Sequence, residues 1–191
     1  MKIIVCVLAV AVLLTLLNAG CAAVRAGYKT APYKTVRHAG KFELRDYPAL
    51  TVAETPMGNA NGSFMRLFHF IGGENAAKQK IAMTTPVFMS GRGTNATMAF
   101  VMPDNSGANK IPKPTAPGVG LKNIGAGRFA VLRFSGGRSL KNETNAVARL
   151  TAWLAQEKIS PMDEPVFAYF DPPWTPPFLR RNEVMLRVTQ P

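Results

Sequence analysis

The side chains that could carry catalytic or metal chemistry are few in this chain of 191 residues. Its two histidines, His38 and His69, and its two cysteines, Cys6 and Cys21, form no H-E-x-x-H or C-x-x-C pattern. The sequence also lacks a G-x-S-x-G elbow, and the G-x-G-x-x-A match at residues 91–96 precedes a predicted strand instead of opening a helix. The pattern gives no metalloenzyme or dinucleotide signal, and we expect a protein that is not an enzyme.

Cys21 stands at the end of a predicted export signal. Lys2 supplies a positive charge, residues 3–17 are almost entirely apolar, and small residues precede Cys21. The pattern resembles the lipobox of bacterial lipoproteins, in which the cysteine is acylated and becomes the new N-terminus, although Asn18 stands where that motif usually has an aliphatic residue. The alternative is an uncleaved anchor, because residues 3–24 carry no charge and could span a bilayer.

We therefore expect a signal peptide (1–20), a lipidated N-terminus and tether (21–36), and one globular domain (37–190). The predicted location is the bacterial cell envelope, with the domain anchored to the inner or outer membrane by the lipid on Cys21 and facing the periplasm. Lys and Arg number 23 against 11 Asp and Glu, which favours anionic partners such as phospholipid or an acidic small molecule. An exported chain rarely meets RNA, so we expect no nucleic-acid partner.

Hydrophobic periodicity divides the domain into two halves with a similar order of elements. In the first half, residues 42–54 are predicted as a strand bent at Pro48, and residues 63–71 as a helix. Strands are expected to follow at 87–89 and 97–102, where apolar and smaller residues alternate. The buried face of the helix is predicted to consist of Phe64, Leu67, Phe68 and Ile71.

The second half repeats this order. Residues 128–134 are predicted as a strand, Asn142 as the N-cap of a helix, and residues 166–170 and 183–188 as the two closing strands. Residues 103–120 are rich in turn formers and are predicted as a surface crossover between the halves. Two β-α-β-β units in succession predict an α+β domain with mostly antiparallel strands.

Two longer segments resemble a known family. Residues 80–87 (KIAMTTPV) and 171–184 (DPPWTPPFLRRNEV) are similar to segments of the SOUL haem-binding protein family. Shorter segments at 42–47, 98–103 and 131–136 also fall where that family has similar sequence, so the resemblance extends from about residue 36 to 188. It implies a distorted antiparallel β-barrel made of two β-α-β-β repeats with two flanking helices. It also implies binding of haem or a related tetrapyrrole on a largely apolar surface without a shared axial ligand.

Haem needs a flat apolar surface, cations for its propionates, and His, Met, Cys or Tyr near its iron. The first helix offers Phe64 and Phe68 as apolar surface and His69 as the candidate iron ligand, with Met65 beside it. Arg66 and Lys80 are candidate propionate partners, as is Lys78. The alternative is that the apolar residues form only the buried face of the helix. Some animal members of the family carry a histidine where this chain has Asp46, so axial coordination from that strand is not expected.

The 171–184 segment supplies three further candidates. Trp174 lies among prolines and is either a hydrophobic plug or a stacking surface for a planar ligand. Arg180 and Arg181 bind a propionate or, as an alternative, pair with Glu183 or Asp171.

The sequence thus predicts a membrane-tethered protein that binds haem or another tetrapyrrole reversibly and sequesters, buffers or transfers it without chemical conversion. The alternative is an envelope scaffold of the same fold that docks proteins or anionic lipid and has no small ligand.

Overall fold

The computed structural model describes residues 15, 20, 27–103 and 111–189. The predicted lipidation site, Cys21, and nearly all of the predicted signal peptide lie outside the described residues. No helix among the described residues is both long enough and apolar enough to cross a membrane.

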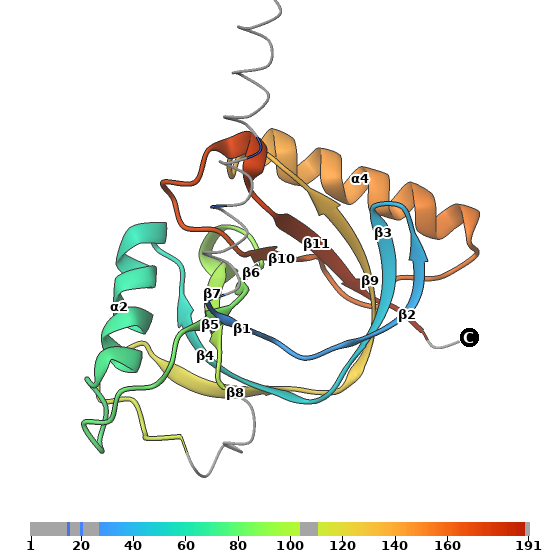
Figure 1. Cartoon of the computed structure of the whole chain (residues 1–191). Coiled ribbons are helices and arrows are strands. Elements are labelled where there is room, and N and C mark those ends of the chain that lie inside the picture. Colours follow the sequence, from blue (N-terminus) through green and yellow to red (C-terminus); the bar gives the residue numbers. More distant parts are fainter. Residues whose placement is uncertain (1–14, 16–19, 21–26, 104–110, 190–191) are drawn as a thin grey trace, which may run out of the picture.

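A curled antiparallel sheet forms the body of the domain (Figure 1). Its spatial order is β2-β3-β9-β11-β10-β6-β7-β4-β8, and neighbouring strands in this order are hydrogen-bonded. A short parallel pair, β1 (Lys29–Thr30) with β5 (Thr84–Thr85), forms a separate two-stranded sheet that packs on β7. The nine strands are β2 (Lys34–Ala39), β3 (Phe42–Tyr47), β4 (Leu50–Pro56), β6 (Val87–Ser90), β7 (Thr97–Val101), β8 (Gly120–Ile124), β9 (Gly127–Phe134), β10 (Val166–Tyr169) and β11 (Asn182–Arg187).

The sheet order reveals the internal duplication. One half contains β3, β4, α2 (Ala60–Gly72), β6 and β7, and the other contains β8, β9, α4 (Leu140–Gln156), β10 and β11. The first strand of each half pairs with a strand of the other half. β3 pairs with β9, and β8 pairs with β4. The predicted α+β architecture of a curled antiparallel sheet with two helices is confirmed.

The predicted elements differ from the observed ones in three places. Residues 42–54 form two separate strands, since the chain leaves the ladder after Tyr47 and re-enters another part of the sheet at Leu50. β8 was not predicted, because its sequence has little apolar alternation and its residues are exposed or only half-buried. Residues 29–36, assigned to the tether, contain β1 and the start of β2.

Side-chain caps begin both helices, and a glycine ends α2. Asn59 Oδ1 accepts a hydrogen bond from the Gly62 backbone N–H at 2.6 Å, and α2 ends at Gly73, whose φ of 120° suits glycine. The cap of α4 is Ser139, whose hydroxyl accepts from the Asn142 N–H at 3.2 Å. Asn142 was therefore wrongly predicted as the N-cap. It lies three residues later, inside the helix.

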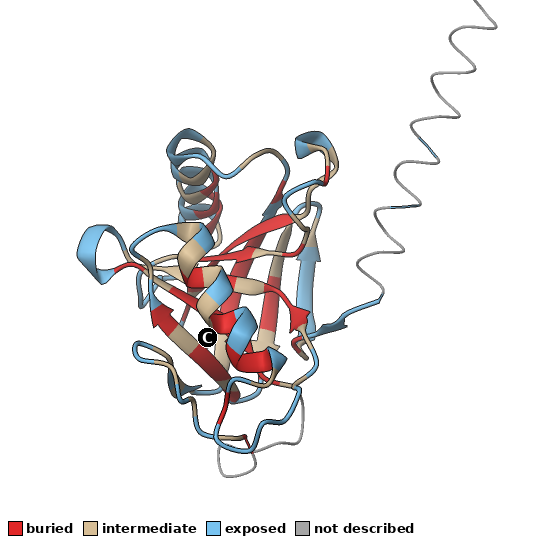
Figure 2. Cartoon of the chain, turned by 90° about the vertical axis from the view of Figure 1, so that its left-hand side faces the viewer, coloured by how far each residue is buried: buried red, intermediate tan, exposed pale blue. Residues whose placement is uncertain are grey.

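The three apolar clusters follow the two faces of the sheet. One cluster fills the concave side, and the other two lie on the convex side beneath α2 and α4. Figure 2 shows buried residues on the strands and on the sheet-facing sides of the helices. The described part of the predicted crossover is not wholly superficial, because Ile111 is buried in the cluster beneath α2 and Pro114 bridges to Asn75.

Candidate functional site

The orientation of α2 decides which of its residues can meet a ligand. Its buried residues are Ser63, Leu67, Phe70 and Ile71. Phe68 is 46% exposed, so its prediction as a core residue is wrong, and Phe70, which the sequence analysis missed, takes its place. The buried face of α2 was not predicted correctly because the first of its buried residues, Ser63, is polar.

Phe68 is exposed but held in place. Its ring stacks on Phe64 with centroids 5.9 Å apart and an interplanar angle of 16°. Phe64 in turn meets Phe100 edge to face at 5.2 Å, and Phe100 is buried in β7. The core thus extends outward through Phe64 to an aromatic face that remains open to solvent.

An open hollow of about 710 Å³ lies at the C-terminal end of α2. Phe68 and His69 contribute the last turn of the helix, and the following loop contributes Lys78. Thr115 reaches the hollow from the crossover between the two halves. The complete lining is Phe68, His69, Gly72, Gly73, Glu74, Asn75, Ala76, Lys78 and Thr115.

Asn75 fixes the loop that lines this hollow. Its buried amide donates to the carbonyls of Phe70 at 3.0 Å and Gln79 at 2.7 Å, and its own carbonyl accepts from the Gln79 N–H at 3.1 Å. The Ala76 N–H donates to the Lys113 carbonyl at 2.9 Å, which attaches the loop to the 111–115 segment. The hollow is therefore built on a hydrogen-bonded frame and is preformed.

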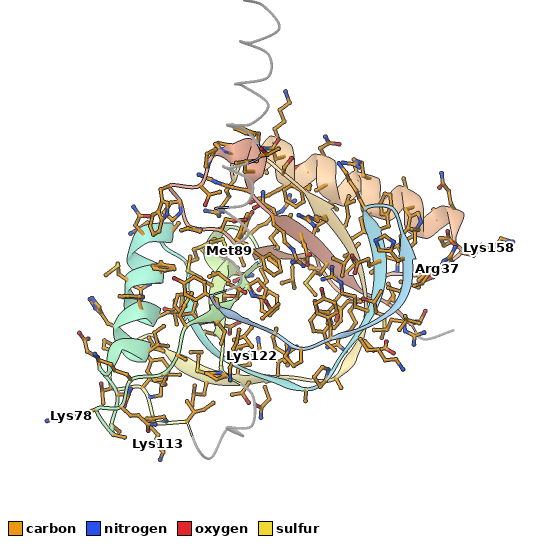
Figure 3. The ribbon with its side chains drawn as sticks, viewed as in Figure 1. Arg37, Lys78, Met89, Lys113, Lys122 and Lys158 are labelled. Atoms are coloured by element: carbon orange, nitrogen blue, oxygen red, sulfur yellow. The ribbon has the colours of Figure 1, made fainter. Side chains whose placement is uncertain are left out.

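The chemistry of the hollow combines an aromatic face, an imidazole and cations. His69 Nδ1 lies 3.7 Å from Glu74 Oε1, and both side chains are at least half exposed. At this distance Glu74 makes no hydrogen bond to the ring, and the other ring nitrogen, Nε2, is open for a ligand. Lys78 and Lys113 both project at this end of the molecule (Figure 3). The described residues hold no group of three or more His, Cys, Asp or Glu suited to a free metal ion.

The structure brings only some of the predicted ligand residues together. Met65 is exposed one turn before Phe68 and His69 on the same helix. Arg66 points instead toward β4, where its Nε donates to Thr55 Oγ1 at 3.1 Å and its Nη2 donates to the Pro56 carbonyl at 3.0 Å. Lys80 is exposed beyond the loop and is not part of the lining.

Trp174, Arg180 and Arg181 belong to the opposite end of α2. The Pro177 carbonyl accepts from the Gly136 N–H, and this turn reaches back to the residues before α2, with Arg138 Nη2 lying 3.9 Å from Met57 Sδ. Figure 1 shows the red 171–181 segment near the start of α2, away from the hollow. A helix of 13 residues is about 20 Å long, so one planar ligand on His69 does not also stack on Trp174.

Both arginines of that segment have protein partners. Arg180 donates to the carbonyls of Thr175 at 2.7 Å and Pro173 at 2.5 Å, and Arg181 pairs with Glu183 at 2.6 Å. The predicted ion pair of Arg181 is confirmed, whereas Arg180 braces its own loop.

The concave side contains an ionic cluster that the sequence analysis did not identify. Arg45 of β3 and Glu183 of β11 are 1% and 0% exposed, and Arg45 donates to both carboxylate oxygens of Glu183, at 2.7 and 3.1 Å. Glu43 accepts from Arg45 Nε at 2.7 Å, and the Arg45 guanidinium lies 4.2 Å from the centroid of the Tyr33 ring. No buried side-chain nitrogen or oxygen among the described residues lacks a partner, so this cluster is closed and satisfied.

The cluster shifts the pKa of its members. The hydrogen bond from Arg45 lowers the pKa of Glu43 below 4.5 despite partial burial. Burial opposes the charge of Arg45, but the hydrogen bonds to Glu183 and Glu43 outweigh it and raise the pKa of the guanidinium. Burial also raises the pKa of Tyr47, whose hydroxyl accepts from Arg45, to about 12.

A comparison with protein families identifies the chain as a member of one of them. The sequence model of the SOUL heme-binding protein family matches residues 28–187, which is most of the chain. The chain belongs to this family. A search of curated proteins gives no match.

Solved structures share the fold. A hydrolase from Listeria innocua has 13% identity and a TM-score of 0.56, covering 81% of this chain and 94% of its own. An uncharacterized conserved protein from Listeria innocua has 14% identity and a TM-score of 0.57, covering 78% and 92%. The C-terminal domain of EcmrR has 16% identity and a TM-score of 0.52, covering 83% and 99%. At these identities the likeness concerns the fold alone.

The segments that carry the family resemblance meet in the structure. Arg45 belongs to the 42–47 segment and Glu183 to the 171–184 segment, and they form the buried ion pair. Thr84 of the 80–87 segment donates its hydroxyl to the Val101 carbonyl in the 98–103 segment. These segments therefore build the frame, while the hollow is lined by residues outside them.

Proposed function

We propose that this protein binds haem or a related tetrapyrrole reversibly in the hollow at the end of α2, while a lipid on Cys21 holds it at the membrane of a bacterial cell envelope. Membership of a haem-binding family supports the ligand class. The observation that carries the site is the preformed hollow, which combines an exposed aromatic ring, a histidine and nearby cations.

Each side chain has a defined part in this proposal. Phe68 offers its ring to the macrocycle, and Met65 extends the apolar surface along α2. His69 ligates the iron through Nε2, since Glu74 lies nearest to its other nitrogen, Nδ1. Lys78 and Lys113 attract the two propionates. Lys113 is a candidate that the sequence analysis did not select, because it stands in a Pro- and Gly-rich segment far from the helix.

Titration of the purified full-length chain with haemin tests the site. We expect saturable binding at one equivalent with a shift of the Soret band. The matched control is His38→Ala, since His38 is the other histidine and lies exposed on β2. Haemin that partitions without saturation would contradict the proposal and favour a scaffold role.

The non-catalytic role has its own test. We propose sequestration, buffering or transfer, since the described lining of the hollow offers an apolar ring and cations for holding a macrocycle and, in His69 and Glu74, a single pair of possible acid and base groups. The bound pigment should be recovered unchanged after extended incubation with reductant and oxygen. Accumulation of an open-chain or altered tetrapyrrole would show that the protein is an enzyme.

The proposed anchor rests on the sequence of the export signal. Metabolic labelling of cells with radioactive palmitate should label the wild-type chain, and Cys21→Ala should abolish the label and release the domain from the membrane fraction. Persistent membrane attachment of Cys21→Ala without label would support the uncleaved anchor instead.

A further inference from the structure

Two large apolar side chains stand exposed on the loop that joins β10 to β11. Trp174 is 79% exposed and Phe178 is 61% exposed. Neither contributes to the lining of the α2 hollow, which lies at the other end of the molecule. A tryptophan buries more apolar area than almost any other side chain, so its exposure in a folded domain indicates contact with something outside the chain.

The loop holds these side chains outward because its backbone is braced. Pro172, Pro173, Pro176 and Pro177 fix φ at four positions. Arg180 lies under the loop and donates to two of its carbonyls, and Asp171 Oδ2 accepts from the Arg181 N–H at 2.6 Å. These bonds and prolines fix the backbone of the loop, so the Cα of Trp174 is held at the surface.

The neighbouring turn adds positive charge. The Gly136 N–H donates to the Pro177 carbonyl at 2.9 Å, and Asn182 Nδ2 donates to the Gly136 carbonyl at 2.9 Å, so the turn that leads into α4 lies against the loop. This turn carries the exposed Arg138, which also pairs with Glu143 at 3.4 Å, and the first turn of α4 carries the exposed Lys141. Amphipathic aromatic rings next to cations suit the headgroup region of a bilayer that contains anionic lipid.

We propose that Trp174 and Phe178 form a membrane-docking platform that inserts into the headgroup region of an anionic phospholipid bilayer. The apolar rings enter the boundary between headgroups and acyl chains, and Arg138 and Lys141 face the lipid phosphates. The chain's formal net charge of +12 favours the same partner.

The predicted anchor brings the platform within reach of such a surface. Cys21 and Tyr28 are seven residues apart in the sequence, which corresponds to at most about 25 Å of extended chain. A domain held this closely meets the bilayer with one of its surfaces. A single acyl chain gives marginal anchoring, and a second contact makes it stable. In this respect the inference rests on the proposed lipid anchor.

The chain contains its own fluorescent probe for this contact. It has two tryptophans, and Trp153 is buried in α4, where it stacks on Phe42 at 5.1 Å. The difference between the wild type and Trp174→Phe therefore reports Trp174 alone. The full-length protein is reconstituted into vesicles of phosphatidylcholine with a minor fraction of phosphatidylglycerol, using lipids brominated at shallow or deep acyl positions.

We expect the Trp174 emission to shift to the blue, to be quenched by shallow bromines, and to lose several-fold in quenching by aqueous acrylamide. Trp174→Phe should show none of these changes, and Phe178→Ala should weaken them, whereas Phe68→Ala should leave them unaltered. If the vesicles retain the protein but Trp174 remains open to acrylamide, the anchor stands and the docking platform is refuted.

Haemin separates this inference from the proposed function. Trp174→Phe should bind haemin as the wild type does, because the platform and the hollow are different surfaces. A loss of haemin affinity in Trp174→Phe, together with a wild-type Trp174 that remains open to acrylamide on the vesicles, would assign Trp174 to the pigment and overturn the platform. Loss of haemin binding by the wild type with intact lipid quenching would refute the proposed function alone.

Discussion

The concave ionic cluster and the α2 hollow differ in whether their side chains are free to bind a ligand. Arg45 and Glu183 have essentially no exposed surface and satisfy one another, so the cluster has no capacity left for a ligand. Phe68 and His69 are exposed on a preformed frame and leave an aromatic face and a ring nitrogen open. The segments that identify the family supply the first region, and less distinctive residues supply the second. Family membership here therefore identifies the fold more directly than the site.

The sharpest test of this contrast is removal of the buried carboxylate. Glu183→Ala leaves Arg45 and Arg181 without their main partner, and stranding a buried charge costs about 3–5 kcal/mol in the free energy of unfolding. Urea denaturation measures the change. The matched control is Glu157→Ala, which breaks an exposed ion pair with Arg37 of similar length, 2.6 Å. It should lower the free energy of unfolding by less than about 1 kcal/mol.

If Glu183→Ala does not fold, Glu183→Gln keeps the shape and one acceptor. It should lower the free energy of unfolding by a smaller amount and leave haemin binding unchanged. Equal losses from the buried and the exposed pair would contradict the structural role of the cluster. A loss of haemin affinity in a folded Glu183→Gln protein would show that the cluster takes part in the site.

Phe68→Ala should lower haemin affinity more than stability, which is the reverse of the effect expected for Glu183→Ala. Phe68→Ala removes the exposed ring of the hollow, and we expect haemin affinity to fall about tenfold because a stacked aromatic contact of about 1 kcal/mol or more is lost. The free energy of unfolding should fall by no more than about 1 kcal/mol, because a half-exposed ring loses its stack on Phe64. Haemin titration and urea denaturation together measure both effects.

Phe178→Ala is the control for this variant, since it removes an exposed phenylalanine at the other end of the molecule. It should bind haemin as the wild type does. If Phe68→Ala loses stability and retains its haemin affinity, the ring is a structural residue and the hollow is not the site.

The overall fold could be predicted to a large extent, because it depends on local periodicity. The helix at 63–71 and the strands around 97–102 and 128–134 were found from apolar spacing within single segments. The pairing of β3 with β9 and of β4 with β8 could not be found in this way, because each half contributes a strand to the other.

The site was harder to predict for the same physical reason. His69 and Phe68 were selected, but the Arg45–Glu183 pair joins residues 138 positions apart, and no local pattern signals that contact. The predicted set also mixed two surfaces, since Trp174 and His69 lie toward opposite ends of α2. Lys113 joins the hollow only through the backbone contact of its segment with Ala76.

His69 should affect the spectrum more than the affinity. His69→Ala removes the proposed nitrogen ligand, and we expect a shifted Soret band with an affinity loss of less than about tenfold, because the apolar contacts remain. Glu74→Gln should produce a much smaller spectral shift, since the iron keeps its ligand and only an exposed carboxylate 3.7 Å from Nδ1 is lost. An unchanged spectrum in His69→Ala would show that the hollow binds the macrocycle without axial coordination from this residue.

The smallest expected effect is the acid response of the ionic cluster. Arg45 lowers the pKa of Glu43 below its ordinary 4.5, so its ionisation stabilises the folded state fully above pH 4.5. This contribution is lost as the pH falls through the lowered pKa, where the folded state also takes up the proton. Urea denaturation on both sides of pH 4.5 should therefore show a shallower acid loss of stability in Glu43→Gln than in the wild type. Parallel pH profiles for the two proteins would mean that Glu43 gains nothing from Arg45 on folding, and the cluster would then be reduced to the Arg45–Glu183 pair.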